Sequence, residues 1–124
     1  MAPAKPDWMT LTVVCATDRD GLSAETAFVL RDMMLAAAPL EFHFLPGSFM
    51  AFFSGDEDGL RRGELLAGDI HSRFAALGVH SLGVAVEQGP CNVTQDGQGH
   101  FTSNPTGETV ERAMRGAVFG REKL

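Results

Sequence analysis

Residues 40–55 read LEFHFLPGSFMAFFSG, two aromatic-rich runs on either side of a Pro-Gly-Ser turn. A Pro-Gly pair between two apolar runs is typical of a β-hairpin. Side chains alternate between the two faces of a strand, so Phe42 and Phe44 share one face. Phe49, Ala51 and Phe53 share one face of the second strand in the same way. The pattern therefore predicts two antiparallel strands with a strongly apolar face.

A strand and a helix are predicted before this hairpin. Residues 10–16 (TLTVVCA) are β-branched and apolar on both faces, which is typical of a central strand covered on both sides or lying at a dimer interface. The helix that follows has Ser23 or Asp20 as its N-cap and stops before Pro39. Its buried stripe recurs at helical spacing and comprises Ala27, Leu30, Met34 and Ala37.

A longer helix, a strand and a last helix are predicted after the hairpin. Asp56 is the expected N-cap of the longer helix, and Gly78 is its expected end. Residues 80–87 alternate as a strand does, and residues 89–105 are polar and Gly-rich, as in a loop or a weak hairpin around DGQG at 96–99. The last helix starts near Thr106. Its inward residues are Val110, Ala113, Met114 and Ala117.

The predicted order is therefore β-α-β-β-α-β, followed by a possible hairpin and a helix. This order is typical of an α+β, ferredoxin-like fold, in which an antiparallel sheet carries helices on one face. A profilin-like sheet is the alternative architecture. One domain is expected over residues 1–124, with residues 1–9 as a flexible lead-in and residues 120–124 as a frayed tail.

Composition excludes several classes of function. The net charge is -6 without a basic stripe, which argues against nucleic acid as the main partner. No run approaches the roughly 20 apolar residues of a membrane span, and the first residues lack the apolar segment of a signal peptide. Cys15 and Cys91 have no Cys-x-x-Cys partner, and the four histidines share no metal-ligand spacing. We expect a cytoplasmic protein that does not bind membranes.

Three stretches, in the correct order, resemble the catalytic domains of class III nucleotide cyclases. TVVCATDRDGLS at residues 12–23 is similar to F-x-D-I-x-G-F-T, with Asp18 on the first metal-binding aspartate of that family. HFLPGSFMAFFSG at 43–55 resembles K-x-I-G-D-x-F-M-A-x-F. GVAVEQGP at 83–90 and PTGETVERAMR at 105–115 are similar to I-G-I-x-x-G-x and G-x-x-V-N-x-A-x-R, with Arg115 on the final arginine.

The departures from the family pattern concern its catalytic residues. Cyclases of this family use two aspartates to hold two divalent metals, which polarise the α-phosphate and activate the ribose 3′-hydroxyl. The second aspartate position is here Gly47, or Ser48 if one residue is deleted. His43 replaces the base-contacting lysine. Glu111 replaces the asparagine that helps to bind the transition state, and its charge would repel triphosphate oxygens.

The resemblance thus implies the fold and a dimeric groove rather than cyclase activity. We expect a catalytically inactive, regulatory homodimer that binds a nucleotide or a small anionic ligand near Asp18, Asp20, His43, Asn104 and Arg115. Asn104 lies at the family's other base-reading position, and Arg115 could contact a phosphate. Asp18 and a carbonyl oxygen could hold one divalent ion, such as Mg²⁺ or Mn²⁺.

Two other functions are consistent with the same residues. The chain could be a small enzyme on a dimeric ferredoxin-like scaffold, with an apolar pocket in the cleft between sheet and helices, as the Phe-rich hairpin and His43 suggest. It could also be a protein-interaction domain whose sheet edge or Phe-rich face docks another protein. For Asp18 and Asp20, the alternative to metal binding is an ordinary turn with a helix-capping aspartate.

Overall fold

The computed structural model describes residues 6–18, 20–21, 23–45 and 47–119 and contains four strands and three helices in this part of the chain. In chain order these elements are β1 (Pro6–Asp18), α1 (Ala24–Ala36), β2 (Glu41–Leu45), β3 (Ser48–Ser54), α2 (Glu57–Ala76), β4 (Leu82–Thr94) and α3 (Glu108–Phe119). The strands form one sheet in the order β2-β3-β1-β4, and all neighbours are antiparallel. The predicted α+β, ferredoxin-like arrangement is confirmed.

Strand β1 is the central and longest-paired strand, as its apolar pattern predicted. Its residues 11–17 pair with β3, and its whole length pairs with β4, from Pro6 opposite Thr94 to Asp18 opposite Leu82. The strand is longer than expected, because residues 6–9 pair with residues 91–94 of β4. These four residues are therefore not a lead-in, while residues 1–5 and the expected tail at 120–124 lie outside the described residues.

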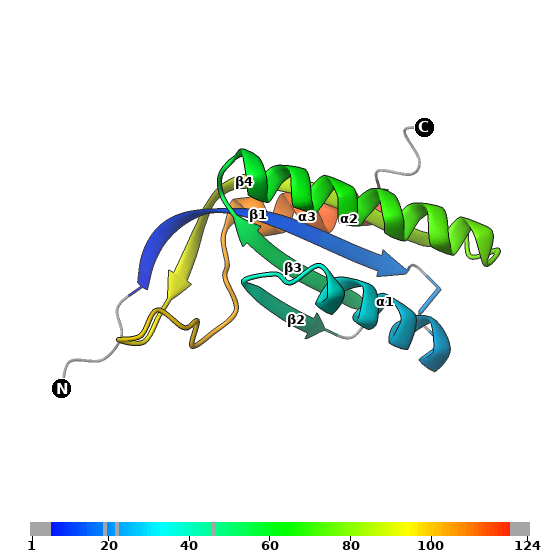
Figure 1. Cartoon of the computed structure of the whole chain (residues 1–124), viewed down its shortest axis with the longest axis horizontal. Coiled ribbons are helices and arrows are strands. Elements are labelled where there is room, and N and C mark those ends of the chain that lie inside the picture. Colours follow the sequence, from blue (N-terminus) through cyan, green and yellow to red (C-terminus); the bar gives the residue numbers. More distant parts are fainter. Residues whose placement is uncertain (1–5, 19, 22, 46, 120–124) are drawn as a thin grey trace.

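The two faces of the sheet are covered by different helices (Figure 1). Helices α1 and α2 lie on one face, where Val14, Phe49 and Phe53 pack against Leu30 and Met34 of α1 and against Leu66, Ile70 and Phe74 of α2. Helix α3 covers the other face over β1 and β4. Its core residues pack with Leu11, Val13, Cys15, Met50 and Phe52. Because both faces are covered, β1 is apolar on both sides.

Short polar motifs define where the elements begin and end. Ser23, and not Asp20, caps α1, because its hydroxyl accepts a hydrogen bond from the Thr26 N–H. Asp56 caps α2 through the Gly59 N–H, as predicted. Gly47 follows β2 with φ +78°, a conformation that favours glycine. No helix within the described residues is long and apolar enough to cross a membrane.

Candidate functional site

The end of β1 and the β2–β3 turn lie side by side. Asp18 is the last residue of β1 and is only 8% exposed. Its backbone N–H donates to the carbonyl oxygen of Gly47 at 3.4 Å. Its carboxylate Oδ1 accepts the N–H of Asp20 at 2.9 Å, and its carbonyl oxygen accepts the N–H of Gly21 at 3.3 Å. Asp18 therefore already stabilises the turn that follows β1. An ordinary turn was the alternative to metal binding at Asp18 and Asp20.

The residue beside Asp18 in the turn is Gly47, which has no side chain. Ser48 belongs to the opposite face of the sheet, where its hydroxyl lies 2.8 Å from the Thr17 hydroxyl. Asp20 is exposed on the turn. No group of three histidine, cysteine or acidic side chains in the described part of the chain is placed to hold a metal ion. Asp18 and Asp20 bring two carboxyl groups to this end of the sheet.

His43 lies on β2, on the sheet face that α3 also covers. Its ring packs edge-on against Phe52, with centroids 5.6 Å apart. Its Nε2 is buried without a hydrogen-bond partner, and the nearest acidic oxygen is Glu41 Oε1 at 3.9 Å. Burial lowers the pKa of His43 below its ordinary 6.5, while Glu41 partly opposes this shift. Burial thus favours the neutral form of the imidazole, in contrast to the charged lysine of the family pattern.

Asn104 lies far from Asp18 within one chain. It is exposed in the loop before α3, two residues from Thr106, which bridges to Asn92 on β4. Asn92 pairs with Trp8, ten residues before Asp18 on the same strand. A strand rises about 3.3 Å per residue, which separates these points by roughly 30 Å. A single nucleotide therefore cannot contact both Asp18 and Asn104 of the same copy.

The arginines of α3 occupy two different environments. Arg115 is exposed on the half of α3 that approaches Gly83, at the Asp18 end of the sheet but on its opposite face. Arg112, one turn earlier, lies 3.9 Å from Glu108 and 4.0 Å from Glu87 of β4. The pattern match did not single out Arg112, because its acidic neighbour on β4 is distant in sequence. The predicted residues therefore form separate groups rather than one site.

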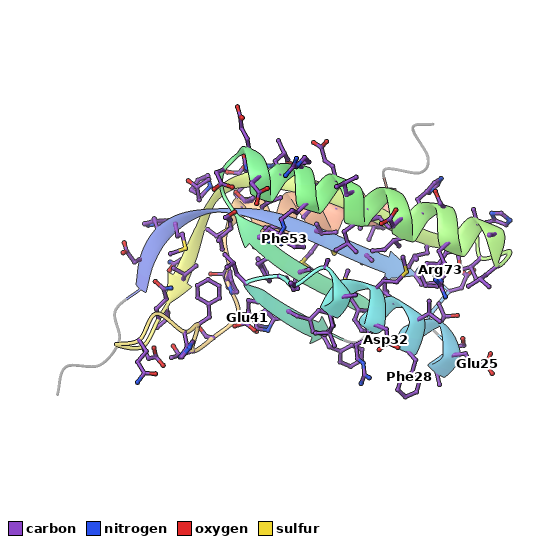
Figure 2. The ribbon with its side chains drawn as sticks, in the orientation of Figure 1. Glu25, Phe28, Asp32, Glu41, Phe53 and Arg73 are labelled. Carbon is purple, nitrogen blue, oxygen red and sulfur yellow. The ribbon has the colours of Figure 1, made fainter. Side chains whose placement is uncertain are left out.

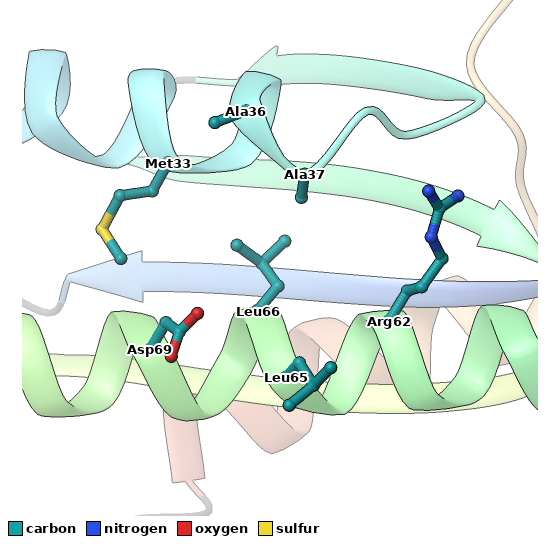
Figure 3. Close-up of a pocket in the computed structure, with 7 residues that line it drawn as sticks. All are labelled: Met33, Ala36, Ala37, Arg62, Leu65, Leu66 and Asp69. Carbon is teal, nitrogen blue, oxygen red and sulfur yellow. The ribbon is translucent and has the colours of Figure 1, made fainter.

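Grooves lie along α1 and beside Glu41, the acidic neighbour of His43. One groove of about 370 Å³ lies between α1 and α2 (Figure 3), and Arg62 and Asp69 lie on either side of Leu66 in it. A second groove of about 450 Å³ lies between α1 and β2. His43 lines neither groove, and the core side chains of α1 and α2 fill the sheet–helix interface. The apolar groove therefore lies beside the Phe-rich hairpin, and His43 does not line it.

Comparison with known proteins identifies the fold. No protein-family model and no curated protein matches the sequence. A bacterial light-regulated adenylyl cyclase has a TM-score of 0.70 at 15% identity, covering 98% of this chain and 44% of that chain. The catalytic core of a rhodopsin-guanylyl cyclase in complex with ATPαS has a TM-score of 0.63 at 19% identity, covering 94% and 75%. This chain has the fold of a nucleotide cyclase catalytic domain.

A further structure agrees with this assignment of the fold. The monomeric guanylyl cyclase domain of a rhodopsin fusion protein from the aquatic fungus Blastocladiella emersonii has a TM-score of 0.60 at 14% identity. The match covers 94% of this chain and 78% of that domain. At such low identity the likeness concerns the fold alone. This chain spans less than half the length of the light-regulated cyclase.

Proposed function

We propose that this chain is a catalytically inactive cyclase-like domain that binds a nucleotide or a small anionic ligand and acts in regulation as a homodimer. The observation that carries the proposal is Gly47, which stands beside Asp18 where the family pattern has its second metal-binding aspartate. The shared fold supports a common origin with nucleotide cyclases. The family's chemistry, however, requires a carboxylate at this position.

The electrostatics at the end of β1 support the loss of catalysis. Two divalent ions about 4 Å apart repel each other strongly and need anionic ligands between them. Asp18 is buried and already engaged by the Asp20 N–H, whereas Asp20 is exposed. The pair could hold at most one Mg²⁺ or Mn²⁺ together with a carbonyl oxygen. Glu111 on α3 adds negative charge where the family has a neutral asparagine.

The distance between Asp18 and Asn104 supports a homodimer. A two-fold axis that places two copies antiparallel brings one end of each copy next to the opposite end of its partner. Asp18 and Asp20 of one copy would then face Asn104 of the other, across a shared groove with His43 and Arg115 at its sides. One structure with the same fold is a non-canonical dimeric guanylyl cyclase domain, with a TM-score of 0.57.

The proposal also includes a cytoplasmic location and a partner other than nucleic acid. Cys15 and Cys91 are both free and buried, which is compatible with a reducing, cytoplasmic location. The acidic net charge of -6 supports a partner other than nucleic acid. A small anionic ligand would therefore depend on local groups, such as a bound cation or Arg115, rather than on the overall field of the protein.

A thermal-shift titration tests ligand binding. We expect ATP, GTP or a cyclic nucleotide with Mg²⁺ or Mn²⁺ to raise the melting temperature, because a ligand at 100 times its Kd adds about 2.7 kcal/mol to stability. Asp18→Asn keeps an acceptor for the Asp20 N–H but removes the charge, so the metal-dependent part of the shift should disappear. A flat melting temperature with every nucleotide, with and without metal, would refute nucleotide binding.

A further inference from the structure

The outer edge of β2 carries backbone groups without a strand partner among the described residues. β2 lies at the end of the sheet and pairs with β3 alone. Leu45 and Ser48 close a two-residue hairpin loop, so backbone groups of alternate residues, Phe42 and Phe44, point away from β3. The Phe42 N–H donates to Glu41 Oε1 at 3.2 Å. A neighbouring carboxylate thus occupies the position that a carbonyl oxygen of an added strand would take.

An apolar groove of about 450 Å³ runs beside this edge, between α1 and β2. Its lining residues are Ala24, Ala27, Phe28, Arg31, Phe42, Phe44 and Phe49. Phe28 is 57% exposed and Phe44 is 60% exposed, although Phe44 packs on Phe49 with ring centroids 4.8 Å apart. The groove therefore offers aromatic surface to water directly next to the outward-pointing backbone groups of Phe42 and Phe44.

Arg31 is the one charged residue among the described residues that line this groove. Its guanidinium lies 5.3 Å from the Phe28 ring centroid and 3.5 Å from Asp32 Oδ1. The side chain of Arg31 is 50% exposed and that of Asp32 is 71% exposed, so water screens this pair and another carboxylate can replace Asp32. Glu25 and Asp32 also belong to α1 but do not line the groove; Figure 2 shows Glu25, Phe28 and Asp32 along this helix. A carboxylate in the groove would thus find Arg31 as its partner.

We propose that the β2 edge and the adjoining groove bind an extended, acidic peptide segment of a partner protein. The segment adds a fifth strand to the sheet through Phe42 and Phe44, places alternate apolar side chains in the groove and pairs an Asp or Glu with Arg31. Strand addition at a sheet edge provides affinity through main-chain hydrogen bonds and specificity through alternate side chains. A small apolar acid would fill the groove but leave the edge unpaired.

This site lies at the outer edge of the sheet and does not depend on nucleotide binding at the end of β1. The test is selection of a phage-displayed library of random dodecapeptides on the immobilised full chain. We expect enriched peptides that alternate apolar residues and contain an acidic residue. The same selection on Phe44→Asp provides the background. A library that yields nothing above that background would overturn the proposal.

Variants and amide exchange of an enriched peptide's complex locate the site. Phe44→Asp and Arg31→Glu should each weaken binding at least about tenfold, whereas Leu77→Asp, at an equally exposed apolar residue at the end of α2, should leave it unchanged. The Arg31 variant keeps the test valid if Phe44→Asp misfolds. The amide proton of Phe44 should become protected from exchange in the complex. Unchanged affinity in both groove variants, or an unprotected amide, would contradict strand addition.

Discussion

At the residue scale, Gly47 leaves room for the carboxylate that the family pattern has at this turn. A Cβ built on Gly47 meets no heavy atom within 4 Å, and aspartate and asparagine tolerate its positive φ better than most residues. We predict that Gly47→Asp binds Mn²⁺ at least about tenfold more tightly than the natural chain, because a second carboxylate near Asp18 adds Coulomb attraction.

Calorimetric titration with MnCl₂ measures this change. Gly47→Asn is the matched control, because it carries a similar side chain at the same φ without the charge. If Gly47→Asp and Gly47→Asn bind Mn²⁺ equally, the missing carboxylate is not what prevents metal binding.

His43 makes the stability of the fold depend on pH. Burial holds the folded-state pKa of His43 below 6.5. The unfolded chain therefore binds more protons than the folded chain once the pH falls to about 6.5. The stabilisation is present above that pH and is lost as the pH falls toward the folded-state pKa. We predict a smaller free energy of unfolding at about pH 5.5 than at about pH 7.5, measured with urea.

The control for this prediction is another histidine. His43→Gln should reduce the pH dependence, while His71→Gln, at an exposed position on α2, should keep it. An equal pH dependence in the natural chain and in His43→Gln would show that His43 is not responsible.

At the element scale, periodicity predicted the helices and the hairpin but not the length of β1 and β4. Residues 89–94 belong to a Gly-rich stretch that predicted a loop or a weak hairpin, because nothing local requires a long strand. They extend β4 because Cys91 and Val93 enter the core on the face of α3, opposite residues 6–9 of β1. Leu77 follows Ile70 and Phe74 at helical spacing, but it is exposed because α2 ends there.

Close contact between α3 and β4 depends on a glycine. A Cβ on Gly83 would collide with the carbonyl oxygen of Ala117. We predict that Gly83→Ala destabilises the chain by about 3 kcal/mol, since overpacking forces the backbone apart. Gly97→Ala is the control, because its Cβ meets no heavy atom within 4 Å. Equal midpoints for both variants in urea unfolding would contradict this packing.

At the scale of the whole molecule, the sequence pattern identified the candidate site residues and their order along the chain. It could not predict where these residues lie relative to one another in the fold. Asp18 and the hairpin turn meet because β1 and β3 are neighbours, which the ferredoxin-like order implies. The separation of Asn104 from Asp18 follows from the register and length of the β1–β4 pair, which no local motif encodes. Two chains, rather than one, are therefore needed to bring these residues to a common ligand.

Release of pyrophosphate from ATP and GTP by the purified protein, with Mn²⁺ present, tests the loss of cyclase chemistry most directly. The proposal predicts that neither pyrophosphate nor a cyclic nucleotide forms above the level without protein, even where a nucleotide raises the melting temperature. Steady formation of both products, abolished by Asp18→Asn, would show that a second metal ligand is supplied elsewhere and that the chain is an active cyclase.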